Sequence, residues 1–440
     1  MISRTQIAEV FHKKEITTTE MRNKVDDWYN MYLSKQVPSG EDDHLRLPYT
    51  VVNKLYKAIF AEYEAESDNE VAQAILDALN EHKKRAMQQS LIAGEAWLKP
   101  YFEGDKIRFN VVTRDNVVVF GRNSENKVTD IATCEEEEAR GSYYKLLERR
   151  WIEDGRLNID TRLYASDDRD SLGHRVPLYS LDKYANIEDL NVIPIDHIGL
   201  IAVTCPAENC VDGSDEAVSV YAAAEQMIHS ANENEHQLKV EFEHGESKVF
   251  VSSDILKGGK IQDDIFTALD DDPENVGIDK YSPALRETSF LVRKNSYLRD
   301  VETLIGIKHG ILSDVDEQAK TATEITSSAG DYSLSVIDFQ EAFEKAVREA
   351  VDITLQLAGI YGVARADVKP EDIVIAWGNG VLYDRDKKKA EYINLAAAGL
   401  IKPEIAVAFF FDIKWKDESD LEKVRTDYMP AIQQLTDPNA

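Results

Sequence analysis

The residue types that could carry chemistry are present, but not at the spacings that known sites require. Cys205 and Cys210 lie close together with His197 upstream, yet they lack the second ligand pair of a structural zinc site. The sequence LKGGK at 256–260 lacks the spacing and the Ser or Thr of a Walker A loop. The acidic run DDDPENVG at 270–277 does not follow the calcium-loop spacing. We therefore expect idle thiols, a solvated acidic loop and no metal or other cofactor.

Hydrolase motifs are missing as well. The chain has no HExxH and no GxSxG sequence, and Gly378 with Gly380 is a lone GxG typical of a plain turn. The 81 Asp and Glu residues give no reason to choose two of them as a general acid and base. We expect a protein that is not an enzyme, and a hydrolase whose carboxylates meet only in the folded chain is the alternative.

Charge is the strongest global signal. The chain has 51 Lys and Arg against 81 Asp and Glu, a formal net charge of -30. Tight non-specific binding to DNA gains its free energy from cations that displace counterions along the phosphate backbone. A surface this acidic is a poor DNA binder, although an acidic wall past which DNA moves is compatible with it.

The apolar segments and the cysteines bear on location. The longest apolar run, IAVAFFF at 405–411, is far shorter than the about 18 residues of a membrane span. The first residues contain no apolar core of a signal peptide. Three cysteines are too few for a disulfide framework. We expect a protein of a reducing compartment, the cytoplasm, without a membrane partner.

Apolar periodicity predicts the elements of the first half. Amphipathic helices are expected at 17–35, at 47–66 and within 68–97, where Gly94 marks the end of the third helix. From Trp97 the pattern alternates, which predicts an antiparallel sheet with turns at Gly104–Asp105 and Asp154–Gly155. A linker-like patch at 205–216 follows.

The second half is organised around long helices. A helix is expected at 214–243, with Asp215 and Glu216 in its first turn and a length of about 45 Å. A strand at 247–253, an acidic excursion and a helix at 288–305 follow, which suggests a stalk with a small β-containing tip. Helix 335–359, a buried strand within 372–384 and three short helices after 384, at 403 and at 418–435 complete an α+β fold that is mainly helical.

The order of these features resembles the portal proteins of tailed bacteriophages of the siphovirus type. The similar segments include WYNMYLSK (28–35), VVNKLYKAIFAEYEAE (51–66), QQSLIAGEAWLKPYFEGDKIRFNVV (88–112), the region 216–256, KTATEITSS (320–328) and YINLAAAGLIKPEIAVAFFF (392–411). The tail after Met429 is shorter than in members with large crowns. The resemblance extends over most of the chain, and it depends on order and spacing rather than on one motif.

The resemblance implies an organisation into named regions. These are N-terminal helices and wing at 1–212, a first stem helix at 213–246, a clip at 247–287, a second stem helix at 288–306, a tunnel loop at 307–320, a long wing helix at 321–362, and a C-terminal wing strand with a short crown at 363–440. Such portals are rings, commonly of twelve subunits, without a catalytic site.

The resemblance also implies partners and site residues. Duplex DNA would pass through the ring during packaging and ejection, and the tunnel loop would touch it through Lys308, His309, Asp314, Asp316, Glu317 and Lys320. The clip acids Asp263, Asp264, Asp270, Asp271 and Asp272 would face the terminase motor or the head–tail connector protein. Major capsid and scaffolding proteins would surround the ring in the virion, after assembly in the host cytoplasm.

Two alternatives to this interpretation stay open. The segment before Lys320 could be an ordinary charged surface connection. The chain could also be another structural or adaptor protein built on long helices, whose assembly would lack a tunnel of duplex width.

Overall fold

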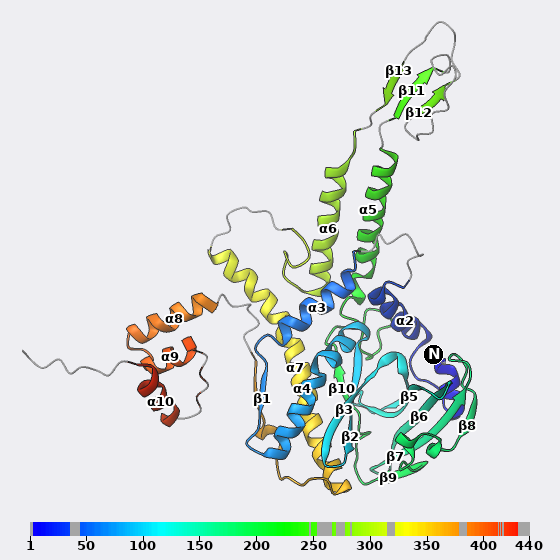
Figure 1. Cartoon of the computed structure of the whole chain (residues 1–440), viewed down its shortest axis with the longest axis vertical. Helices are drawn as coiled ribbons and strands as arrows, with labels where there is room; N and C mark the ends of the chain where they lie inside the picture. The colour runs from blue at the N-terminus through cyan, green and yellow to red at the C-terminus, as the bar shows by residue number, and fades with distance from the viewer. Residues whose placement is uncertain are drawn as a thin grey trace, which may run out of the picture. The chain divides into compact units, whose positions relative to one another are not determined.

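The computed structural model describes residues 3–35, 45–245, 248–252, 266–269, 278–281, 284–314, 322–377, 385–411, 413, 415 and 418–429. The chain divides into two units, Met1–Gly380 and Val381–Ala440. Figure 1 shows long helices and antiparallel strands in the first unit, and short helices in the described part of the second. The expected mixture of helix and antiparallel sheet is confirmed.

Three of the expected helices form the helical part of the core. They are α2 (Thr19–Leu33), α4 (Glu70–Ala93) and α7 (Ala322–Tyr361). The hydroxyl of Thr18 caps α2 by accepting the Met21 N–H at 3.1 Å, and the Asn69 side chain caps α4. Most of the apolar side chains predicted to face the core from these helices are buried, including Trp28 of α2 and Phe343 of α7.

The β-rich region consists of two antiparallel sheets. The smaller has the order β10-β2-β3, and the larger has the order β4-β5-β6-β7-β8 with β9 also paired to β7. Turns at Gly104–Asp105 and Asp154–Gly155 join β2 to β3 and β6 to β7, as predicted. The strands are β2 (Glu95–Glu103), β3 (Lys106–Thr113), β4 (Val117–Arg122), β5 (Val128–Ala139), β6 (Ser142–Glu153), β7 (Arg156–Ser166), β8 (His174–Val176), β9 (Leu190–Ile193) and β10 (Ile201–Thr204).

A short N-terminal helix, α1 (Arg4–Val10), was not expected from the sequence. Ser3 and Gln6 form a capping box at its start. Ile7 of this helix and Phe11 after it are buried in a small cluster with Val118 and Leu147 of the larger sheet. The helix therefore covers part of that sheet.

The expected helix at 47–66 is too long. Helix α3 (Leu47–Ile59) ends at Ile59, and residues 64–66 form strand β1 (Glu64–Glu66), which pairs antiparallel with β14 (Val374–Ala376). The ring of Phe60, after the helix end, meets the Phe343 ring edge-on at 4.8 Å. The strand expected within 372–384 is present as β14, but it is short and it is not buried, since Val374 is 66% exposed. Residues 378–384 lie outside the described chain.

The expected helix at 214–243 begins later than predicted. Helix α5 spans Glu225–His244 and follows a 3₁₀ turn at Ala222–Ala224. At about 1.5 Å per residue it is about 30 Å long, not 45 Å. Glu216 lies outside the helix because its carboxylate is buried against Arg114, at 2.5 Å.

After α5 the chain forms a small sheet and then a second long helix. The sheet has the order β12-β11-β13, from β11 (Lys248–Ser252), β12 (Phe266–Leu269) and β13 (Ile278–Tyr281). Helix α6 (Glu287–Ile305) agrees with the prediction. Leu298 and Val301 are buried as expected, but Leu291 is 45% exposed.

The second unit contains the expected short helices. They are α8 (Arg385–Ala397), α9 (Pro403–Phe411) and α10 (Glu418–Tyr428). The rings of Tyr392 and Phe409 stack at 4.3 Å and join α8 to α9. Residues 430–440, at the end of the third predicted helix, lie outside the described chain.

Candidate functional site

Helices α5 and α6 lie side by side and run in opposite directions (Figure 1). Lys294 pairs with Glu235 at 3.0 Å, and Arg286 pairs with Glu241 at 2.6 Å. The residue numbers of the partners fall on α6 as they rise on α5, which defines the antiparallel register. The two ion pairs lie about two helical turns apart and fix this register along the pair.

The start of α5 is attached to α2 by polar contacts. Glu225, the first residue of α5, accepts hydrogen bonds from the Trp28 indole and from the Lys24 ammonium, each at 2.5 Å. The Tyr221 hydroxyl donates to the Trp28 carbonyl at 2.8 Å. The hydrogen bond with Glu225 raises the pKa of Lys24. The root of this helix is thus fixed to the N-terminal helices.

A buried arginine holds the segment that precedes this root. Arg114 donates to the carbonyls of Ala93 and Ala217, at 3.2 and 2.7 Å, and pairs with Glu216 at 2.5 Å. Its side chain is 7% exposed. A cation at the carbonyl end of α4 is favourable for the helix dipole. Arg114 therefore connects α4, the sheet region and the approach to α5.

The connection that leaves α6 is folded around one carboxylate. Glu302 of α6 is fully buried. Its Oε1 accepts the backbone N–H groups of Gly310, Leu312 and Ser313, at 3.1, 2.5 and 3.0 Å. Its Oε2 accepts the Ser313 hydroxyl at 2.7 Å and lies 3.1 Å from His309 Nδ1. Because an ionised carboxylate only accepts hydrogen bonds, Nδ1 of His309 carries the proton.

These contacts set the ionisation of Glu302. Burial alone would raise the pKa of this carboxyl, but hydrogen bonds from Leu312 and Ser313, with a further one from His309, outweigh burial and lower the pKa. A backbone hydrogen bond also attaches this segment to α6, since the Ile307 N–H donates to the Glu302 carbonyl at 2.9 Å. Glu302 is therefore ionised at neutral pH.

A second side chain of α6 holds the far end of this segment. The Asn295 amide oxygen accepts the Asp314 N–H at 2.7 Å, and its amide nitrogen donates to the Asp314 carbonyl at 3.2 Å. Arg299 also donates to that carbonyl at 3.2 Å. Residues 306–314 are thus held to α6 at both ends. We call this segment the anchored segment.

The residues expected to contact DNA divide into two groups. Lys308 is half-buried on the anchored segment, His309 is exposed and rests on Glu302, and the Asp314 side chain is exposed. Asp316, Glu317 and Lys320 lie outside the described residues, as do the five clip acids Asp263, Asp264, Asp270, Asp271 and Asp272. The anchored segment contributes to the fold, because Ile307 is 6% exposed and belongs to the main core.

The structure identifies two residues that the sequence analysis missed, Glu302 and Asn295. A signal for Glu302 was present. It falls on the same helical face as Leu298, Val301 and Ile305, where a carboxylate is costly unless it is paired. An acid on an apolar stripe, followed by Gly306 and Gly310, points to a loop that folds back to supply donors.

The cysteines do not form a metal site with the nearby histidine. His197 instead accepts the Gly199 N–H at Nδ1, at 3.0 Å, and donates from Nε2 to Glu349 at 2.9 Å. Cys205 is buried, which raises its pKa to about 12, and Cys210 is exposed. Within the described ranges, no group of three or more His, Cys, Asp or Glu side chains could hold a metal ion.

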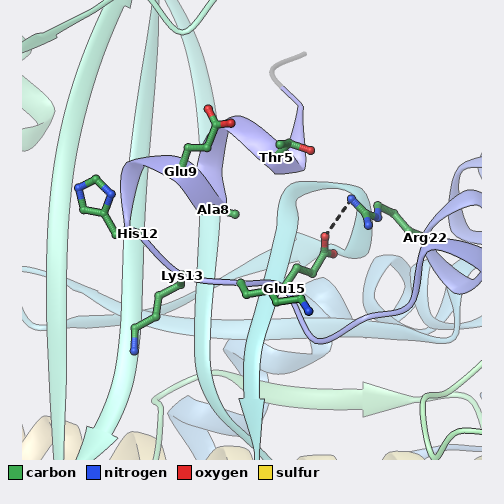
Figure 2. A pocket seen from close by; sticks show the side chains of 8 residues that line it. Thr5, Ala8, Glu9, His12, Lys13, Glu15 and Arg22 are labelled. Carbon is green, nitrogen blue, oxygen red and sulfur yellow. Dashed lines mark ion pairs between the residues drawn. The ribbon is translucent and has the colours of Figure 1, made fainter.

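A hollow of about 600 Å³ lies beside α1 and the chain that follows it. Figure 2 shows the Glu15 carboxylate directed at the Arg22 guanidinium, with an ion-pair distance of 3.4 Å. Burial raises the pKa of Glu15, and Arg22 partly offsets this. The hollow is lined by Thr5, Ala8, Glu9, His12, Lys13, Lys14, Glu15 and Arg22. The lining contains both acidic and basic side chains.

Comparison with known proteins identifies the family. The family of phage portal proteins of the SPP1 Gp6-like type matches residues 51–427. Because the match extends over most of the chain, the protein belongs to this family. It is a structural family whose members are capsid-associated components of the phage virion. The sequence matches no curated protein. Across the parts of the chain that are described, no helix is long and apolar enough to span a membrane.

Proposed function

We propose that twelve copies of this chain form a ring whose central channel carries the phage genome into the capsid and out of it. The family match over residues 51–427 is the observation that carries this proposal. The antiparallel pair α5–α6, with a small sheet between the two helices in the chain, suits a stem that ends in a clip. The ring would dock the terminase, the head–tail connector and the capsid and scaffolding proteins, after assembly in the host cytoplasm.

The regions of the chain are assigned accordingly. The wing comprises residues 1–212. The stem consists of the helices within 213–246 and 288–306, and the clip comprises residues 247–287. The tunnel loop is 307–320, the long wing helix 321–362, and the last wing strand and a short crown 363–440. The late start of α5 at Glu225 makes 213–224 the connection between wing and stem rather than stem helix.

The charge of the chain supports a channel that DNA passes without sticking. Twelve copies carry 12 × (-30) = -360 formal charges, and an acidic wall does not release counterions from DNA. A few cations among acids, such as Lys308, His309 and Lys320 with Asp314, Asp316 and Glu317, would give weak and reversible contacts. No catalytic residue is required, because the terminase supplies the work.

Assembly is the first test. Mass photometry and negative-stain microscopy of the purified chain should show a ring of about twelve subunits with a central hole. A stable monomer or dimer under packaging conditions would contradict the proposal and favour the hydrolase or adaptor alternatives.

Contact with DNA is tested by reversing one charge. Lys308→Glu adds a ring of negative charge to the channel and should lower DNA filling of procapsids, because it repels the phosphates. Lys106→Glu, at the exposed first residue of β3, is the matched control and should fill normally. If both variants form intact rings and fill procapsids with DNA equally, Lys308 does not face the channel.

Docking is tested at the clip. Replacing Asp263, Asp264, Asp270, Asp271 and Asp272 by Asn should weaken capture of the terminase in a pull-down, because charge complementarity steers such encounters. The ring itself should still form. Unchanged capture would show that these acids do not face the motor.

A further inference from the structure

We propose that Glu302 is a positioning residue that sets the place of Lys308 and His309 by holding the anchored segment, 306–314, to the stem helix α6. The anchoring follows from geometry alone. Its consequence for DNA depends on the proposed function, in which this segment begins the tunnel loop.

The position of Glu302 is unfavourable for a carboxylate unless the segment supplies hydrogen bonds. It lies in the last turn of α6, where the helix dipole disfavours negative charge, and it is fully buried. A buried charge left without partners is strongly destabilising. The N–H groups of Gly310, Leu312 and Ser313 therefore stabilise the end of the helix by satisfying the buried carboxylate. The carboxylate in turn holds the segment in place.

The backbone of the segment is shaped to present these donors. Gly306 and Gly310 have φ values of 77° and 97°, a region that favours glycine. Successive N–H groups that converge on one anion form a nest, and here the anion belongs to the same chain. The Ser313 hydroxyl bridges the two parts, since it donates to Glu302 Oε2 and accepts the Gly310 N–H at 3.2 Å.

Lys308 lies between the points of attachment. Ile307 is fixed by burial and by the Glu302 carbonyl, and His309 contacts the Glu302 carboxylate. With Asp314 held by Asn295, the chain around Lys308 has both neighbours fixed. The backbone at Lys308 is thus held to α6, and the Glu302 carboxylate is the acceptor that the donors of this segment share.

Hydrogen–deuterium exchange of the assembled protein tests the anchoring. Glu302→Gln keeps the size of the side chain but replaces one acceptor oxygen with a donor, so exchange in a peptide covering 306–314 should become about tenfold faster or more. Glu287→Gln, an exposed acid in the first turn of the same helix, is the matched control and should leave exchange unchanged. Unchanged exchange in Glu302→Gln would overturn the proposal.

Ser313→Ala provides a milder variant, in case Glu302→Gln does not assemble. It removes the two hydrogen bonds of the hydroxyl and should accelerate exchange in the same peptide. In the double variant the two effects should be less than additive, because both act through one network. Additive effects would show that Glu302 and Ser313 do not form a unit.

A double-mutant cycle in a packaging assay tests whether Glu302 positions Lys308 or only stabilises the fold. If Glu302 places Lys308, the packaging defect of Lys308→Glu should be smaller in the Glu302→Gln background than in the wild type. The same Lys308→Glu defect in both backgrounds would overturn the positioning role. If neither substitution changes packaging while exchange still accelerates, the DNA role of the loop fails and the anchoring stands.

Discussion

At the scale of single residues, a few buried charges determine how distant segments meet. Arg114 is nearly buried and binds two carbonyls and the Glu216 carboxylate, with Glu95 at 3.8 Å. Ion pairs with Arg122 and Arg114 outweigh the burial of Glu95, and the pKa of that carboxyl is lowered. Such groups are costly to bury separately, so each depends on its partner.

Removing Arg114 should therefore destabilise the fold strongly. Arg114→Met removes the ion pair of the buried Glu216 carboxylate, which keeps the hydrogen bond from the Thr17 hydroxyl, and should cost about 3–5 kcal/mol of unfolding free energy. Arg175→Met, which breaks an exposed pair with Asp189, should cost less than about 1 kcal/mol. Urea titrations of the two variants provide the comparison. Similar costs would show that burial does not decide the difference.

The ionisation of Glu302 predicts a pH dependence. Because its pKa in the folded protein is lowered from 4.5, the stability that it contributes is complete above that value. This contribution is lost as the pH falls through the lower, folded value. The difference in stability between wild type and Glu302→Gln should thus be constant from pH 6 to 8 and shrink below about pH 4.5. Thermal melts at a series of pH values measure it, and a difference that grows on acidification would be inconsistent.

At the scale of elements, the C-terminal end of α4 binds segments that are distant in the sequence. Gly94 ends the helix with φ of 88°. The Leu91 carbonyl accepts the Val220 N–H at 3.0 Å, and the Gly94 carbonyl accepts the Cys205 N–H at 2.7 Å. These two carbonyls, at the end of the helix where intrahelical partners are lacking, are thus satisfied by chain more than 100 residues away in the sequence.

Two glycine substitutions should separate backbone strain from crowding. A Cβ at Gly94 would lie 2.3 Å from the Ala217 carbonyl oxygen, which belongs to the backbone, whereas a Cβ at Gly104 would meet nothing within 4 Å. Both have positive φ, so Gly104→Ala should cost about 1 kcal/mol and Gly94→Ala about 3 kcal/mol or more. Shifts in melting temperature measure both. Equal shifts in melting temperature would contradict the close packing of the backbone at 217–218 against Gly94.

At the scale of the whole molecule, the net charge of -30 would oppose association between copies. In the proposed ring, neighbouring subunits would repel one another, and salt would screen this repulsion within a Debye length of about 8–10 Å. The antiparallel register of α5 and α6, by contrast, is built within one chain and does not require a second copy.

Ring formation should accordingly be favoured by moderate salt. Sedimentation velocity at low and at near-physiological ionic strength should show a larger ring fraction in the second condition. Replacing the salt with an uncharged solute at equal osmolality should not have this effect. Rings that dissociate as salt rises would indicate that attraction between charges, not screened repulsion, holds the subunits together.

The sequence by itself determined the elements whose stability is local. Apolar residues at helical spacing, with Thr18 and Asn69 as caps, were sufficient for α2 and α4, and the turns at Gly104–Asp105 and Asp154–Gly155 were sufficient for two hairpins. The order of motifs also indicated the portal family. These signals lie within a few residues of one another, so no distant contact is needed to interpret them.

Only the tertiary structure decided the features that depend on partners far away in sequence. Residues 64–66 are a strand because 374–376 pair with them, and α5 starts at Glu225 rather than near 214 because Glu216 is bound by Arg114, 102 positions earlier. The position of Glu302 on an apolar helix face is visible in the sequence, but the donors that satisfy its carboxylate are known only from the folded anchored segment. In each case the free energy of a buried polar group depends on its neighbours in space, and a local pattern does not contain them.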